Sequence, residues 1–133
     1  MEYREPPPRI LGRPYEEVVE ALNVVEYAVS LDPRHAWANG ALCAGQWLVG
    51  YEPLAPITGE PTPVRWETVA DELTLAGCVV QGFATAPLVR GGSRPTPDVN
   101  RAWAAGASAM LRYAIGYSDE PPIRLRRPRV STP

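Results

Sequence analysis

The chain contains no lysine, because all 13 of its basic residues are arginines. It therefore has no residue that forms a lysine Schiff base, acts as a phosphate-loop lysine or serves as a lysine general base. Abundant arginine together with abundant alanine is typical of a GC-rich genome. We read the missing lysine as a property of a GC-rich host.

Histidine and cysteine are almost as scarce. His35 is the single histidine, so a multi-histidine metal site is excluded. We interpret it as a surface residue in the first turn of a helix, with a lone general base beside Asp32 as the alternative. Cys43 and Cys78 form no C-x-x-C pair and lie in apolar segments, which predicts two buried free thiols in a reducing cytoplasm.

Long apolar runs and a large net charge are also lacking. The longest uncharged stretches, 36–51 and 73–89, are shorter than the ~20 apolar residues of a membrane helix, and the acidic, proline-rich start does not resemble a secretory signal. A net charge of −2 disfavours nucleic-acid binding through bulk charge. We therefore predict one domain over 1–133 that binds no membrane and lies in the cytoplasm or within a viral particle.

The sequence repeats itself. His35–Ala41 aligns with Arg101–Ala107 at an offset of 66, and this register also pairs Trp47 with Tyr113, Gly50-Tyr51 with Gly116-Tyr117, and Pro56-Ile57 with Pro122-Ile123. The preceding segments match at an offset of 51, which pairs Tyr15 with Trp66, Glu20 with Asp71, and Leu22 with Leu73. The difference between the offsets places an insertion at 84–97. The chain reads as an internal duplication, with repeat one at about 13–59 and repeat two at about 63–125.

Each repeat predicts a helical hairpin. Apolar side chains recur at helical spacing in the first and third helices (Tyr15, Val18, Leu22, Val25, Val29 and Trp66, Val69, Leu73, Ala76, Val80). Pro14, Asp32-Pro33, Thr62-Pro63 and Asp98 suit helix starts. Gly50 and Gly116 suit left-handed helix ends, with Tyr51 or Tyr117 folding back. We predict an all-α, four-helix bundle of two tandem αα-hairpins, with helices at 14–30, 33–50, 63–83 and 98–116.

Three glycines fall in the interior of the second and fourth predicted helices. Gly40, Gly45 and Gly106 each cost about 1 kcal/mol relative to alanine in a helix interior. A close approach between the second and fourth helices would offset that cost. We therefore expect these two helices to form the inner pair, crossing near a pseudo-twofold axis.

Proline dominates outside the helices. Pro6-Pro7-Pro8 opens the chain, 52–63 links the hairpins, and a C-terminal tail at 121–133 carries Arg124, Arg126, Arg127 and Arg129. We expect extended segments that hold little core of their own. The tail arginines are either a solvated end or a contact with a partner, most simply another subunit.

Acidic residues cluster on the first and third predicted helices. Glu16, Glu17 and Glu20 form an E-E-x-x-E pattern, with Glu67, Asp71 and Glu72 at matching places. The pattern resembles part of the signature of the all-helical nucleotide pyrophosphatases, which implies Mg²⁺-dependent hydrolysis by Glu16, Glu20, Glu67 and Asp71. The downstream E-x-x-D of that family is absent from this chain. The alternative is that these acids complement helix dipoles on a solvated surface.

Two further places could bind a ligand. Arg90, Gly91, Gly92, Ser93 and Arg94, within the insertion, combine backbone N–H groups with guanidinium forks that suit an anion, although such runs are also common connectors. Trp37 and Trp103 occupy matching positions and either line a cavity for a flat ligand or belong to the core.

No nucleophile–base pair, phosphate-binding glycine loop or zinc spacing is found in the sequence. The leading prediction is a non-enzymatic assembly, adaptor or structural protein that needs no cofactor and no metal. It would act through protein–protein contacts with a partner or as a homo-oligomer, for example in a phage particle. A small-ligand or anion-binding bundle is the second hypothesis, and a metal-dependent nucleotide hydrolase is the third.

Overall fold

The computed structural model describes residues 9–82 and 100–123. This part of the chain is predominantly helical, as predicted, with α1 at Tyr15–Leu31, α2 at Ala36–Leu48, α3 at Trp66–Gln81 and α4 at Arg101–Ile115. A small antiparallel hairpin of β1 (Arg9–Ile10) and β2 (Arg13–Pro14) precedes α1, and the sequence did not predict it. No helix in the described ranges is long and apolar enough to cross a membrane.

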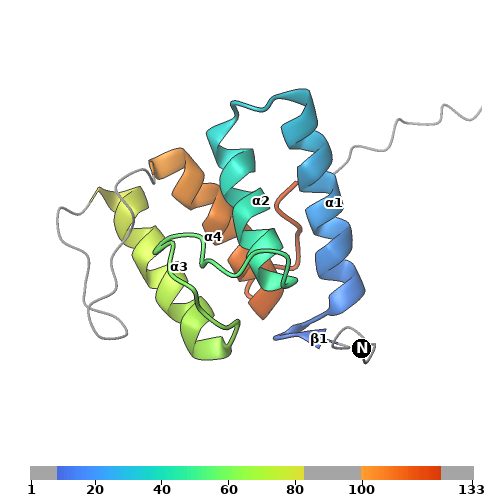
Figure 1. The fold of residues 1–133 in the computed structure, drawn as a ribbon, viewed down its shortest axis with the longest axis vertical. Helices are drawn as coiled ribbons and strands as arrows, with labels where there is room; N and C mark the ends of the chain where they lie inside the picture. The colour runs from blue at the N-terminus through green and yellow to red at the C-terminus, as the bar shows by residue number, and fades with distance from the viewer. Residues whose placement is uncertain (1–8, 83–99, 124–133) are drawn as a thin grey trace, which may run out of the picture.

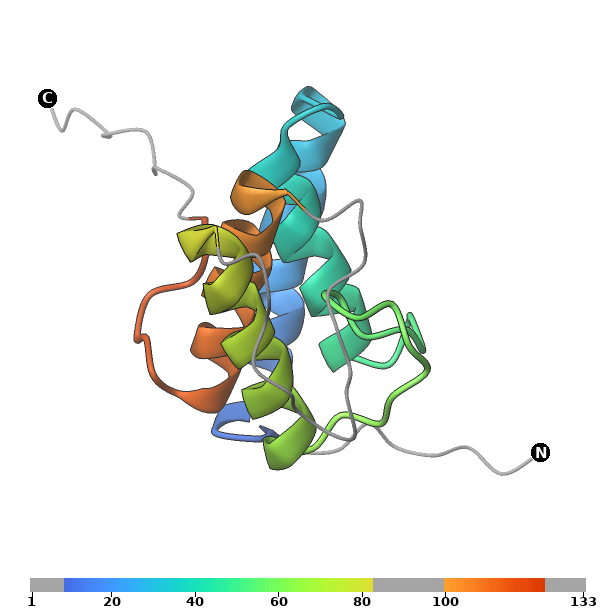
Figure 2. The same ribbon diagram turned by 90° about the vertical axis from the view of Figure 1, so that its left-hand side faces the viewer.

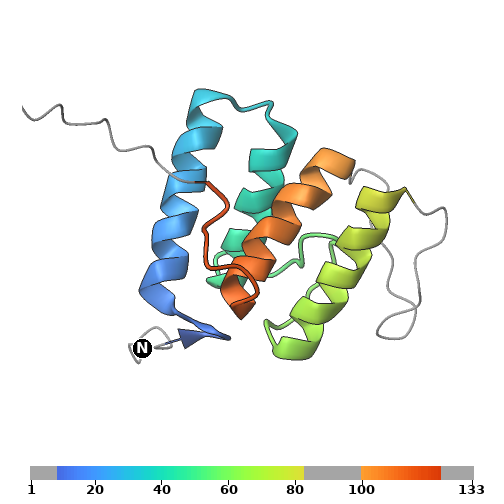
Figure 3. The same ribbon diagram turned by 180° about the vertical axis from the view of Figure 1, so that it is seen from behind.

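The helices are arranged around a central pair. Helices α2 and α4 pack against each other, α1 packs on α2, and α3 packs on α4. Helices α1 and α3 therefore lie on opposite sides of the α2–α4 pair (Figure 1). Helices α1 and α3 begin at one end of the molecule, where α2 and α4 finish, and the view from behind shows the same order (Figure 3).

Two interior glycines bring α2 and α4 together. A methyl group added at Gly40 would overlap the backbone carbonyl of Trp103, and one added at Gly106 would overlap the backbone carbonyl of Trp37. The two contacts are reciprocal, because each glycine lies 66 residues from its counterpart, as does each tryptophan. The close approach predicted at Gly40 and Gly106 is confirmed, whereas a methyl group added at Gly45 would first meet the Leu22 side chain of α1. That the hairpins are copies of one another stays a prediction.

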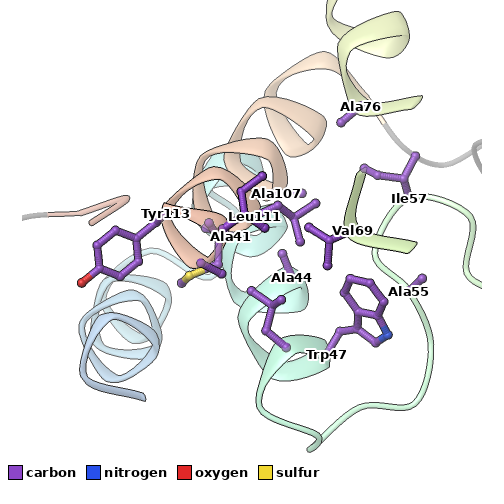
Figure 4. Close-up of a cluster of buried hydrophobic side chains, with 14 of the residues drawn as sticks. Ala41, Ala44, Trp47, Ala55, Ile57, Val69, Ala76, Ala107, Leu111 and Tyr113 are labelled. Carbon is purple, nitrogen blue, oxygen red and sulfur yellow. The ribbon is translucent and has the colours of Figure 1, made fainter. Parts of the chain in front are cut away.

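The core lies between the central pair and the flanking elements. Alanines supply much of the central seam, since Ala41, Ala44 and Ala107 are fully buried. Larger side chains close the sides of this seam, among them Trp47 and Leu111 (Figure 4). The Trp47 indole N–H donates to the carbonyl of Thr62 at 2.8 Å, so its polar edge is satisfied.

The linker after α2 corrects one expectation. Residues 52–63 were expected to hold little core, yet Ala55, Pro56, Ile57 and Thr58 are all buried. The linker is folded back on itself, because the Ala55 N–H donates to Glu60 and the Thr62 N–H donates to Pro53. The prolines of the linker have no backbone N–H, but the N–H groups of Ala55 and Thr62 still hold the loop together.

The helix starts also differ from the sequence assignments. His35 caps α2, where its Nδ1 accepts from the Ala38 N–H at 3.1 Å, and Asp32 instead follows the end of α1. The predicted start at Thr62-Pro63 shifts to Trp66.

At α4, the Asn100 side chain accepts from the Trp103 N–H at 2.8 Å, whereas Asp98 lies outside the described residues. At the starts of α2 and α4, a nearer side chain reaches the first free N–H groups of the helix.

The predicted glycine helix ends are confirmed. Gly50 has a φ of 89° and Gly116 a φ of 84°, which favours glycine because it lacks a Cβ. The next backbone N–H groups fold back in the same way, from Tyr51 to Gln46 and from Tyr117 to Arg112, both at 2.9 Å. Both tyrosine side chains nevertheless point to solvent, with exposed fractions of 66% and 74%.

Candidate functional site

The acidic residues of α1 and α3 do not form a common centre. The two helices lie on opposite sides of the α2–α4 pair (Figures 1 and 3). Glu16, Glu20 and Glu67 are exposed on their own helices. Within residues 9–82 and 100–123, no group of three histidine, cysteine, aspartate or glutamate side chains is placed to hold a metal ion. The geometry therefore adds no support to the hydrolase hypothesis.

Glu72 has a different role from the acids beside it. Its side chain is fully buried, and its Oε1 accepts from the N–H groups of Ile57 at 2.9 Å and Thr58 at 3.2 Å. The Thr58 hydroxyl lies 3.4 Å from the same oxygen. Glu72 thus binds the linker to α3, which is a structural task because it satisfies backbone donors inside the core.

Cys43 lies near this buried carboxylate. Burial raises the pKa of its thiol to about 11, and the negative charges of Glu52 and Glu72 add to the effect. The thiolate is therefore scarce at neutral pH, which makes Cys43 a poor nucleophile. Both cysteines are free, as predicted, but only Cys78 is buried and Cys43 is partly exposed.

The paired tryptophans belong mainly to the core. Trp37 and Trp103 are partly buried and pack against the hydrophobic cluster, and their backbone carbonyls face the two interior glycines. Their side chains therefore contribute to the packing of the core. Whether they also contact a ligand stays a prediction.

The remaining predicted site residues lie outside the described ranges. Arg90, Gly91, Gly92, Ser93 and Arg94 belong to 83–99. Arg124, Arg126, Arg127 and Arg129 belong to 124–133. Their proposed roles stay predictions that rest on sequence alone.

The outer surface of α4 carries two adjoining hollows that the sequence did not predict. The larger, of ≈410 Å³, lies between the last turns of α4 and the segment that follows it (Ala109, Arg112, Tyr117, Ser118, Glu120, Pro121, Pro122). The smaller, of ≈310 Å³, lies between α3 and α4 (Gly77, Val80, Gln81, Ala105, Ser108, Ala109, Arg112). Both are open to solvent. The exposed Arg112 borders both hollows, and the larger one is also lined by the acidic Glu120.

Four aromatic residues lie at helix ends at the end of the molecule where α1 and α3 begin, although α1 and α3 themselves lie on opposite sides of the α2–α4 pair. Tyr15 and Trp66 are the first residues of these helices, and Tyr51 and Tyr117 follow α2 and α4 at the same end (Figure 1). Trp66 is 52% exposed. Burial raises the pKa of Tyr15, and a side-chain hydrogen bond with Tyr51 contributes. We call these four residues the aromatic end.

Arg13 connects the N-terminal hairpin to the end of α4. Its Nε donates to the Tyr113 carbonyl and its Nη2 to the Ser118 carbonyl, both at 2.8 Å. The guanidinium lies 3.8 Å from the centre of the Tyr113 ring. Burial raises the pKa of Tyr113, and the charge of Arg13 partly opposes that shift. The contact holds Ser118 at the start of the segment that borders the larger hollow.

Comparisons with protein-family models, with curated proteins and with solved structures found no match to this chain. Any functional conclusion therefore rests on the surface features described above.

Proposed function

We propose that this chain is a non-enzymatic assembly or adaptor protein that binds other protein chains through its surface. The observation that carries the proposal is the aromatic end. Tyr51, Trp66 and Tyr117 are each more than half exposed, and they lie at one end of the molecule. Tyrosine and tryptophan are enriched where proteins meet, because each offers a large apolar area and a polar edge.

In this proposal, the sequence repeat accounts for the positions of the four aromatic residues. Tyr15 aligns with Trp66 at an offset of 51, and Tyr51 aligns with Tyr117 at an offset of 66. Each hairpin then supplies one aromatic residue at a helix start and one after a helix end. Two diverged copies of one hairpin would present a two-part surface to a partner or to another subunit. The cytoplasm or a viral particle would be its setting.

Native mass spectrometry and analytical ultracentrifugation of the protein from its own host test the proposal. We expect discrete multimers, or a copurifying protein, that the double variant Trp66→Ser/Tyr117→Ser reduces. Val80→Ser is the matched control, because Val80 is a 39% exposed apolar residue near the far end of α3. A monomer without a bound protein at every concentration would refute the proposal, as would an equal loss in the control.

A second candidate function, the binding of a small ligand or anion, is favoured by the hollows beside Arg112. A guanidinium at the edge of a concave surface suits a carboxylate or phosphate. Titration with inorganic phosphate in a thermal unfolding assay tests it. Stabilisation of the wild type but not of Arg112→Gln would support this function, and an unchanged unfolding temperature in both would reject phosphate as the ligand.

A further inference from the structure

The sequence divides its charge between a basic end and an acidic remainder. Residues 124–133 contain four of the 13 arginines and no acidic residue. The preceding 123 residues keep nine arginines against all 15 acidic residues, so their net charge is −6 and that of the last ten is +4. The described chain ends at Ile123, and the strongly basic segment follows directly.

Helix α1 presents an exposed surface that complements this segment. Glu16, Glu20, Asn23, Tyr27 and Leu31 recur every three or four residues, and all five are exposed. They therefore form one stripe along the helix, which we call the α1 stripe. Tyr27 is 56% exposed and Leu31 is 70% exposed, so the stripe combines acidic and apolar groups.

The carboxylates of this stripe lack a cationic partner in the described part of the chain. The salt bridge between Arg13 and Glu17, at 3.3 Å, is the one ion pair formed between two described residues. Glu17 lies to one side of the stripe, and α1 itself contains no basic residue. Glu16 and Glu20 therefore offer two carboxylates to an incoming cation.

We propose that the arginine segment 124–133 of one copy binds the α1 stripe of a second copy. Guanidinium groups would pair with Glu16 and Glu20 and stack on the ring of Tyr27. An extended ten-residue segment reaches ~31 Å, enough to follow a helical stripe of ~22 Å. The prolines of the segment lower the entropic cost of its binding. This inference rests on the proposed function and names its partner as another copy of the chain.

Ile123 packs against the hydrophobic core, whereas the α1 stripe points away from Val18, Leu22 and Val25, the buried residues of α1. The arginine segment must therefore leave the surface on which Ile123 packs before it meets a stripe. We assign it to the stripe of a second copy because the proposed function is assembly between chains, and binding within one copy is the alternative that the test below separates.

Charge reversal in the full-length protein tests the contact by sedimentation equilibrium. Glu16→Arg/Glu20→Arg and Arg126→Glu/Arg127→Glu should each weaken self-association at least about tenfold. The chain that carries all four substitutions should recover to within about threefold of the wild type, because the charges are exchanged. Circular dichroism should show unchanged helicity in the stripe variant, whose substituted residues are exposed.

Each other outcome is decisive. Multimers that neither reversal weakens, or that the fourfold variant fails to restore, overturn the α1 contact and leave the proposed function standing through the aromatic end. A monomer in which Arg126→Glu/Arg127→Glu changes hydrogen exchange in α1 shows binding within one copy and overturns the inference. A monomer without that change, at every concentration and without a bound protein, refutes both proposals.

Discussion

The segments that follow α2 and α4 begin alike and end differently. Both leave their helix through a left-handed glycine and the same backbone hydrogen bonds. They then pack on opposite sides of the helices (Figure 2). Ile57 becomes fully buried in the core, whereas Ile123, its counterpart at an offset of 66, is only half-buried. A hollow of ≈410 Å³ remains beside the second segment.

The difference originates in the helix that each segment meets. Glu72 of α3 accepts the backbone N–H groups of Ile57 and Thr58. At an offset of 51 the matching position in α1 is Ala21, a buried methyl group that can accept no hydrogen bond. Helix ends are therefore set by local residues, whereas the path of the chain beyond them depends on a buried acceptor in a neighbouring element.

The largest expected effect tests what the two halves share. Gly40→Ala and Gly106→Ala each place a methyl group against a backbone carbonyl of the opposite helix, so α2 and α4 must separate. We expect each to cost about 3 kcal/mol of unfolding free energy, measured by urea denaturation. Gly77→Ala is the control, because no atom lies within 4 Å of its added methyl group, and it should stabilise by up to about 1 kcal/mol. Unequal losses of unfolding free energy in Gly40→Ala and Gly106→Ala would show that the two halves differ at this contact.

The next prediction concerns what the halves do not share. Glu72→Ala removes the acceptor of two buried backbone N–H groups, and we expect a loss of about 2–3 kcal/mol with release of the linker. Hydrogen exchange at Ile57 and Thr58 should rise in the variant. Glu72→Gln keeps an acceptor oxygen and should lose less than half as much. Equal losses in the two variants would contradict a role as acceptor.

Substitution of Arg13 tests how the segment after α4 is held in place, since it has no buried acceptor like Glu72. Arg13→Met keeps the apolar stem but removes the donors to Tyr113 and Ser118, and we expect a loss of about 2 kcal/mol. Glu17→Gln removes only the ion pair with Arg13, of which Glu17 is the half-exposed partner, and should cost at most about 0.5 kcal/mol. A loss in Glu17→Gln as large as in Arg13→Met would instead assign the stability to the ion pair.

The sequence predicts the features whose causes are local. Helical periodicity locates the four helices, and glycine in a helix interior anticipates the α2–α4 contact. The observed cap residues differ from the predicted ones because several polar residues lie near each helix start. The path of the backbone decides which of them caps the helix. The sequence pattern indicates the burial of Glu72 only weakly, since Val69, Glu72 and Ala76 share one side of the helix. No sequence pattern indicates the hollows beside Arg112, because they depend on where the segment after α4 packs.

The prediction with the smallest expected effect on folding compares the reactivity of thiols at matching positions in the two halves. Cys43 and Ala109 lie 66 residues apart, and Ala109 lines both hollows. With its pKa raised by burial from 9.0 to about 11, only about 0.1% of Cys43 is thiolate at pH 8, whereas a thiol with a pKa of 9.0 is about one tenth ionised. Ala109→Cys, placed beside Arg112 in a Cys43→Ser background, should therefore react with iodoacetamide on the order of 100-fold faster than Cys43 does in the wild type.

The Cys43 thiol also predicts a pH dependence. Folding raises the Cys43 pKa from 9.0 to about 11, so the unfolded chain binds fewer protons between these values. Stability should then fall as pH rises from about 9 to about 11, and less steeply in Cys43→Ser.

In the iodoacetamide experiment, a Cys43 that reacts as fast as the thiol introduced by Ala109→Cys would show that the first half is as open as the second. The contrast between the two segments would then lie in their backbone paths alone.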